Sequence, residues 1–149
     1  MPMLRRTALV VIVALATATA AAAQTRGPDT LVGTPGPDVI HGLGGNDRIQ
    51  GRAGNDRLYG GRGDDTIFGD TGNDVISGGP GSDTLLGGSG RDRITGGAGQ
   101  DTIVAGISND TVRARDGEVD RITCGPGRDR VFADPQDVVA KDCESVTRG

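Results

Sequence analysis

Aliphatic residues recur at every ninth position along most of the chain, each of them two residues after an aspartate. The residue between the aspartate and the aliphatic one is Thr, Arg or Val, which suits the outward face of a strand. A strict period of nine is the signature of a repeat architecture rather than of an ordinary globular core. The ten aspartates in this register are Asp29, Asp38, Asp47, Asp56, Asp65, Asp74, Asp83, Asp92, Asp101 and Asp110.

Glycines complete the repeating unit, G-x-x-G-x-D-x-aliphatic-x, which is seen cleanly in Gly78–Leu86. Glycine stands two residues before nine of the ten aspartates, and Ser108 is the exception. We expect the first six residues of a unit to form a turn, because Gly, Asn and Asp tolerate positive φ. The last three residues are expected to form a short strand with only the middle side chain pointing inward.

One unit buries a single aliphatic side chain and cannot be stable alone, whereas stacked units bury a continuous aliphatic ladder. The pattern therefore predicts an all-β solenoid of parallel strands. If two units make one coil, aspartates that are two units apart lie above one another. Strands in a sheet are about 4.8 Å apart, and two unit charges at that distance repel by ~3–4 kcal/mol at an effective dielectric of about 20. A hard divalent cation relieves this repulsion, and calcium accepts flexible carbonyl geometry better than magnesium does.

Composition alone would indicate disorder. After residue 23, 33 of 126 residues are Gly or Pro and only 25 are Leu, Ile, Val or Phe, which is little apolar surface to offset the ordering entropy. The chain has no Trp, one Tyr and two Phe. The period of nine reverses this interpretation, provided that a cation is present.

The first 23 residues have the pattern of a cleaved secretory signal. Arg5 and Arg6 precede the uncharged stretch Thr7–Ala18, and small residues lead to an expected cleavage after Ala23. We therefore expect a secreted protein, exported by the general route rather than the twin-arginine route. A retained N-terminal anchor is the weaker alternative, because the apolar run is short for a membrane span and no later stretch approaches the ~20 residues required.

Without the leader the chain has 14 basic and 20 acidic residues, hence a net charge of −6. This charge argues against nucleic acid or an anionic membrane surface as a partner and favours a cation. Cys124 and Cys143 both lie near the C-terminus, and in an exported protein they predict a disulfide. Two thiols and the single distant His41 are not enough for a tetrahedral zinc site.

The unit resembles the RTX (repeats-in-toxin), or hemolysin-type, calcium-binding nonapeptide, G-G-x-G-x-D-x-aliphatic-x. Residues 33–104 match it continuously, for example in Gly60–Phe68 and Gly96–Val104. The resemblance implies a right-handed parallel β-roll with two repeats per turn and Ca²⁺ between the loops of successive turns, held by the aspartate and by backbone carbonyls. The side-chain ligands that it implies are Asp38, Asp47, Asp56, Asp65, Asp74, Asp83, Asp92 and Asp101.

The ends of the array depart from this pattern. The first unit lacks its leading glycine and the tenth lacks the glycine before its aspartate, so Asp29 and Asp110 are edge candidates only. After Asp110 the aspartate-x-aliphatic pattern continues at spacings of ten, nine and eight. We predict three segments, which are a signal peptide (1–23), the repeat β-roll (24–113) and irregular, disulfide-pinned capping coils (114–149) that protect the open end. Four cap aspartates are interpreted mainly as turn residues, with further calcium ligands as the alternative: Asp116, Asp120, Asp129 and Asp134.

The sequence favours an exported calcium-binding protein that folds when the ion binds. An enzyme is not expected, because the chain has one His and no G-x-S-x-G elbow, and repeated carboxylates suit ligands better than paired catalytic acids. A calcium-stabilised adhesive or surface-structural module that binds a cell-envelope or matrix partner is the alternative, and a secreted calcium buffer or spacer also stays open. A pore-forming toxin is disfavoured, because no amphipathic or apolar spanning segment follows the leader.

Overall fold

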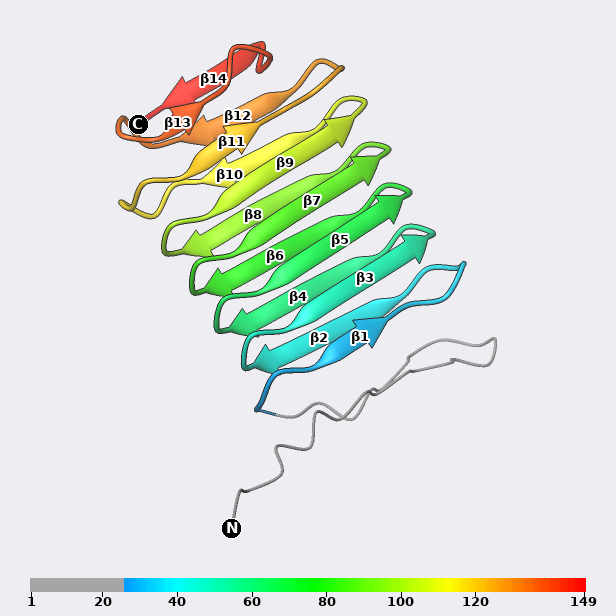
Figure 1. Ribbon diagram of the computed structural model, residues 1–149. Helices are drawn as coiled ribbons and strands as arrows, with labels where there is room; N and C mark the ends of the chain where they lie inside the picture. Colours follow the sequence, from blue (N-terminus) through cyan, green and yellow to red (C-terminus); the bar gives the residue numbers. More distant parts are fainter. Residues whose placement is uncertain (1–25) are drawn as a thin grey trace.

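The computed structural model describes residues 26–149, which form a stack of β-coils (Figure 1). The predicted signal peptide, residues 1–23, lies outside the described residues. Within residues 26–149 the regular secondary structure is entirely β, and successive strands alternate between two parallel sheets of seven strands each. Because no helix is present in this range, no helical segment there is able to span a membrane.

We name the two sheets by the numbers of their strands. The odd sheet contains, in spatial order, β1 (Thr30–Val32), β3 (Arg48–Ala53), β5 (Thr66–Thr71), β7 (Thr84–Ser89), β9 (Thr102–Ile107), β11 (Arg121–Thr123) and β13 (Val138–Val139). The even sheet contains β2 (Val39–Gly44), β4 (Arg57–Arg62), β6 (Val75–Pro80), β8 (Arg93–Ala98), β10 (Thr111–Ala114), β12 (Arg130–Ala133) and β14 (Ser145–Arg148).

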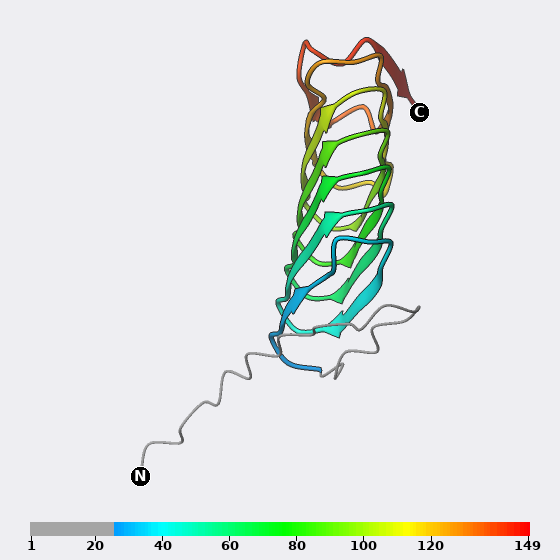
Figure 2. The same cartoon turned by 90° about the vertical axis from the view of Figure 1, so that its right-hand side faces the viewer.

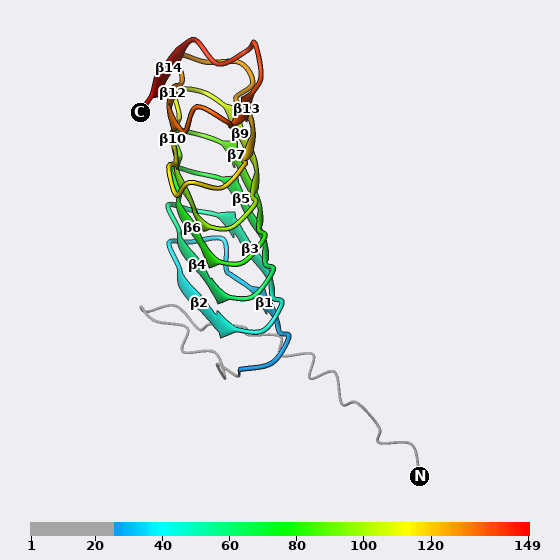
Figure 3. The same cartoon turned by 90° about the vertical axis from the view of Figure 1, so that its left-hand side faces the viewer.

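Two repeats make one coil, as the sequence predicts. Ile49 of β3 pairs with Ile67 of β5, and this offset of two repeats recurs through the array. Seen from the side, the two sheets face each other and the turns join them at both edges (Figures 2 and 3). The predicted parallel β-solenoid is therefore confirmed.

Strands β2 to β9 have six residues each, so the expectation of a three-residue strand and a six-residue turn was wrong. The strand continues through the glycines that begin the next unit. In β5, Ile67 and Gly69 both point inward, two positions apart. Glycine fits there because it lies against the backbone of the next coil, where a larger side chain would collide.

The core is a ladder of aliphatic side chains, one from each repeat. Their exposed fractions are between 0% and 4%, although the protein is poor in large apolar residues. Because each side chain packs between its counterparts in the coils before and after, the buried apolar surface is continuous along the stack. The repeat-array members are Leu31, Ile40, Ile49, Leu58, Ile67, Ile76, Leu85, Ile94, Ile103 and Val112.

Strands β2 to β9 each bend near their end through a left-handed backbone position. Gly61 has a φ of 111° there, and a side chain on it would meet the backbone of Leu43 in the preceding coil. Leu43, Arg52 and Asp70 hold the same position with φ between 72° and 81°. A left-handed non-glycine residue costs roughly 1–2 kcal/mol, so these three units accept a strain that the others avoid with glycine.

The C-terminal coils keep the architecture while the register changes. Val112 pairs with Val131, which is one residue further along the chain than the two-repeat offset of 18. Val131 pairs with Val146, which is only 15 residues later. The Cys124–Cys143 disulfide forms as predicted and joins two of these coils. The added and removed residues are absorbed in the turns, so the parallel pairing continues to β14.

We expect the disulfide to account for a large share of the stability of this end. Alanine is the chosen replacement, because Ala105 of β9 holds the position equivalent to Cys124. Replacing both cysteines by alanine should lower the free energy of unfolding by about 3 kcal/mol, because the loop between the two cysteines is no longer closed. Urea unfolding in calcium, followed by circular dichroism, measures this loss. Dithiothreitol should reproduce it in the parent protein and leave the double variant unchanged. Equal midpoints for the parent and the double variant would show that the bridge contributes nothing.

Candidate metal site

The repeat aspartates form a ladder inside each edge of the solenoid. The backbone N–H of Asp47 donates to Oδ1 of Asp65 at 2.8 Å, and the N–H of Asp65 donates to Oδ1 of Asp83 at 2.8 Å. The same bond links each aspartate to the one two repeats later. Every coil is thus joined to the next by a carboxylate as well as by the strand pairing.

The second carboxylate oxygen, Oδ2, is buried and accepts no hydrogen bond in most of these residues. An ionised carboxylate without a partner is costly to bury, so ten such oxygens in one small protein require an explanation. Among residues 26–149, the unpartnered Oδ2 atoms belong to Asp47, Asp56, Asp65, Asp74, Asp83, Asp92, Asp101, Asp110, Asp120 and Asp129.

From Asp38 to Asp101, each Oδ2 faces a glycine that lies five residues earlier in the chain. A Cβ atom placed on Gly60 would meet Oδ2 of Asp65 and the carbonyl oxygen of Gly78, the latter at 2.7 Å. On Gly87, the Cβ would lie 2.6 Å from Oδ2 of Asp92 and would also meet the carbonyl oxygen of Ala105. The glycine therefore leaves space where a carboxylate oxygen and a carbonyl oxygen of the next coil come together. We call this space the glycine cradle.

The environment disfavours the ionised form of these carboxylates. Burial raises the pKa of Asp83 and of Asp92 to about 7, against the opposing effect of the backbone N–H that each accepts. Carboxylates in the neighbouring coils raise the pKa further. The same desolvation raises the pKa of Asp47, Asp56 and Asp101 to about 6. A cation among the oxygens would reverse this tendency, because opposite charge stabilises the ionised form.

The groups around the cradle fit a hard divalent cation. The polar atoms there are oxygens, one from a carboxylate and, from Asp38 to Asp92, one from a backbone carbonyl, which is the donor chemistry that calcium prefers. No three carboxylate, imidazole or thiol groups converge on one point within the described residues. A cation at this place would therefore take its remaining ligands from the backbone, as the sequence predicts. When bound, calcium would supply the positive charge that the buried Oδ2 lacks.

Six of the eight predicted ligands share this geometry, from Asp47 to Asp92, and at Asp101 the glycine meets Oδ2 without a nearby carbonyl oxygen. Asp38 differs, because its Oδ2 accepts hydrogen bonds from the backbone N–H of Thr34 and from Thr34 Oγ1, the latter at 3.0 Å. The Oδ2 of Asp38 therefore has a hydrogen-bond donor in the Thr34 hydroxyl, whereas the Oδ2 atoms of the other predicted ligands have none.

Sequence reasoning did not place Asp120 and Asp129 in the ladder. The N–H of Asp101 donates to Oδ1 of Asp120 at 2.8 Å, and that of Asp110 donates to Oδ1 of Asp129 at 2.8 Å. Both aspartates belong to the aspartate-x-aliphatic pattern, which was the available signal. Each lies 19 residues after its ladder partner instead of 18, so the period of nine did not reveal the alignment. Asp116 and Asp134 lie in turns, where their carboxylates accept backbone N–H groups.

The cap aspartates lack the glycine cradle. At the point equivalent to the cradle glycine, the strand pairing places Ala105, Ala114 and Cys124, each buried. The methyl group of alanine, or the CH₂–S group of cysteine, occupies the space that is open beside glycine in the repeats. The ladder therefore extends into the cap, whereas the cradle ends at Asp101.

The comparison with family models assigns these repeats. Four copies of the RTX calcium-binding nonapeptide repeat match at residues 25–58, 41–76, 50–85 and 77–112, which together cover more than half of the chain. The chain belongs to this RTX repeat family. No curated protein and no solved structure matches it. The RTX repeats thus coincide with the coils that contain a glycine cradle, and the matched range ends before β11.

Filling one RTX cradle should weaken both metal binding and folding. Gly60→Ala puts a methyl group against Gly78 and Asp65, so we expect the free energy of unfolding in calcium to fall by about 1–3 kcal/mol. The stoichiometry measured by titration calorimetry should also fall by at least one ion. Gly44→Ala is the matched control, because its Cβ would make only an ordinary contact at 3.6 Å. Equal losses in the two variants would contradict a cradle at Gly60.

The raised pKa values predict opposite effects of pH on folding and on calcium binding. Without calcium, folded Asp83 and Asp92 hold protons up to a pKa of about 7, whereas the unfolded chain releases them near 4. Stability in EDTA is therefore greatest in acid and falls as pH rises through 7. Calcium competes with these protons, so its affinity should rise between pH 6 and pH 8. Urea unfolding and calorimetry at several pH values test both trends, and apo stability that increases with pH would refute the assignment.

Proposed function

We propose that this RTX protein is an exported calcium-binding protein whose β-roll folds on Ca²⁺ binding between successive coils. The carrying observation is the row of buried Oδ2 atoms without donors, of which those from Asp47 to Asp92 each lie beside a glycine cradle and a carbonyl oxygen. Membership in a calcium-binding repeat family supports the identity of the ion. The aspartates from Asp47 to Asp101 are the proposed side-chain ligands, and Asp38 is the weakest of the predicted set because Thr34 already partners it.

The energetics suit folding that depends on the ion. With ~1 mM calcium outside the cell and a site dissociation constant near 0.1 mM, each site adds ~1.4 kcal/mol by mass action. Seven sites of this strength would contribute about as much as the whole stability of a typical domain. In a cytoplasm poor in calcium, the unpaired carboxylates would oppose folding and keep the chain ready for export.

Export itself rests on two observations. The basic and then apolar start of the chain has the pattern of a signal peptide, and the Cys124–Cys143 disulfide suits an oxidising compartment. We further propose that the protein is not an enzyme, because the ladder carboxylates are closed off from substrate inside the roll. Their role as calcium ligands accounts for them without a reaction.

Circular dichroism tests the proposal directly. In EDTA at neutral pH we expect the strand signal to be largely lost, and titration with calcium to restore it cooperatively. Magnesium at the same concentration should restore much less, because it prefers a rigid octahedral shell. An unchanged spectrum in EDTA and in millimolar calcium would defeat the proposal.

A pair of adjacent substitutions separates ligand loss from charge loss. Asp65 is buried with a free Oδ2, whereas Asp64 is exposed and its Oδ1 accepts the N–H of Ser82. Asp65→Asn should raise the calcium concentration needed for half folding several-fold, and Asp64→Asn should leave it within about twofold. The two variants lose the same charge, so an equal response would point to bulk electrostatics instead of a ligand.

A further inference from the structure

The charged side chains divide unequally between the two outer faces of the roll. The strands of the even sheet contain no Asp or Glu, although the chain as a whole has 20 acidic residues and 16 basic ones. The odd sheet carries Asp70 among its strands and three arginines. The arginines of the even-sheet strands are Arg57, Arg62, Arg93, Arg113, Arg130 and Arg148. We call the outer surface of this sheet the even face.

Three of these arginines form a regular row along the stack. Arg57, Arg93 and Arg130 share the first outward position of their strands, and the pairing places Val75 and Thr111 between them. The arginines therefore recur on every second strand, about 9.6 Å apart at the usual strand spacing. All three are exposed, so the row presents evenly spaced positive charge to the solvent.

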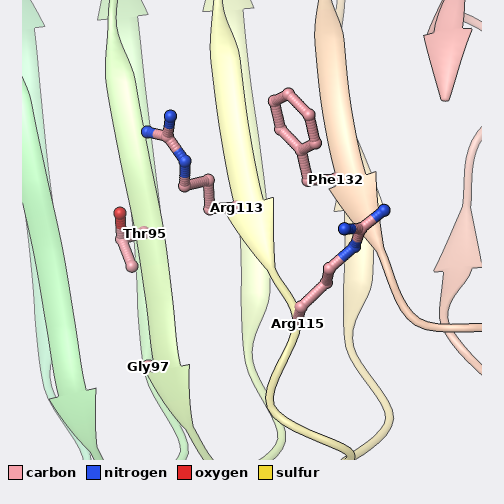
Figure 4. A pocket seen from close by; sticks show the side chains of 5 residues that line it. All are labelled: Thr95, Gly97, Arg113, Arg115 and Phe132. Carbon is pink, nitrogen blue, oxygen red and sulfur yellow. The ribbon is translucent and has the colours of Figure 1, made fainter. Parts of the chain in front are cut away.

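A pocket lies near this row at the C-terminal end of the even face (Figure 4). Arg113 and Arg115 lie on either side of Phe132, with their guanidinium carbons 5.6 and 5.7 Å from the ring centre. The pocket has a volume of about 320 Å³ and is also lined by Thr95 and Gly97. Among the described residues no carboxylate pairs with Arg113, which leaves its guanidinium available for an anion.

The rest of the even face suits a polar chain better than an apolar one. Thr111 places a hydroxyl group between Arg93 and Arg130, and Ser77 and Thr95 place hydroxyl groups at the next outward position of their strands. The odd sheet presents Phe68, Leu86 and Val104 at the corresponding outward position. A polar ligand with regular negative charges would therefore prefer the even face, whose strands carry six arginines and no carboxylate.

We propose that the even face binds an acidic polysaccharide in which every second sugar carries a carboxylate or sulfate. A disaccharide of an extended polysaccharide spans roughly two strand separations, so the charges of such a chain lying along the stack would meet Arg57, Arg93 and Arg130 in turn. The pocket between Arg113 and Phe132 would hold one further acidic group. Bidentate guanidinium contacts to carboxylate or sulfate provide the recognition.

Nucleic acid matches this face less well. Its phosphates recur every ~3.4 Å along each strand of a duplex, which is much closer than the arginine spacing. Single strands are held by open aromatic surfaces, but His41 and Tyr59 stack on each other with 4.6 Å between ring centres. Phe132 lies between two guanidinium groups. The polysaccharide is therefore the occupant that the even face favours.

This inference rests on the proposed function and adds a second ligand to it. The polysaccharide would contact the outer surface, whereas the proposed calcium sites lie inside the roll. The test therefore begins with calcium-loaded protein whose folding has been confirmed by circular dichroism. Hyaluronan, which carries one carboxylate per disaccharide, is the probe, and neutral dextran is the uncharged control. Binding of immobilised protein to each polymer is measured over a range of salt concentrations.

Arg93→Gln/Arg130→Gln and Arg48→Gln/Arg121→Gln form a matched pair of variants. All four residues hold the same outward strand position, but the second pair lies on the odd sheet. We expect the even-face variant to bind hyaluronan about tenfold more weakly and with a shallower salt dependence, and the odd-sheet variant to change by less than about twofold.

Three results would overturn the proposal. Equal weakening in the two variants would show that only net charge matters. Binding of dextran as tight as that of hyaluronan would remove the role of the arginines. Binding of single-stranded DNA without binding of hyaluronan would identify the even face as a nucleic-acid surface instead. Failure of the calcium-dependent folding test is seen separately, in the dichroism measurement that precedes the binding assay.

Discussion

A carboxylate directed into the protein from every repeat is the constraint on which the rest of the structure depends. Its Oδ1 accepts the backbone N–H of the aspartate one coil earlier, which fixes the height of the coil. From Asp47 to Asp129 its Oδ2 is buried without a hydrogen-bond donor, so a positive charge would stabilise the folded state there. Glycine stands opposite this oxygen from Asp38 to Asp101, where a side chain would fill the space. Turn composition, coil height and the proposed metal dependence therefore all follow from one side chain.

The thin core explains why this dependence is tolerated. One aliphatic side chain per repeat buries little apolar surface, so the ladder from Leu31 to Val112 alone does not offset the ordering of so many glycines. At the C-terminal end, where alanine and cysteine replace the cradle glycine, a covalent bridge is present instead. The two parts of the solenoid would thus be stabilised by different means, the proposed ions in the repeats and a disulfide in the cap.

Much of the fold followed from sequence because the period of nine leaves little freedom. The spacing of Asp47, Asp65 and Asp83 predicted both the coil of two repeats and the alignment of the carboxylates. The strand length was not predicted, because glycine is a turn residue in isolation and becomes extended here only by packing against the next coil. The partnership of Thr34 with Asp38 and the inclusion of Asp120 in the ladder depend on local three-dimensional geometry. A rule of spacing does not contain this information.

The parallel pairing of each strand with the strand two repeats later also has a mechanical consequence. Each coil contacts mainly the coil before and the coil after it, so a chain pulled from its N-terminal end would detach one coil at a time. Every detached coil would release about 60 Å of extended chain. The Cys124–Cys143 bridge would stop the unwinding at the last coils. With calcium bound as proposed, such a molecule would be an extensible tether whose resistance to force is set by the surrounding calcium concentration.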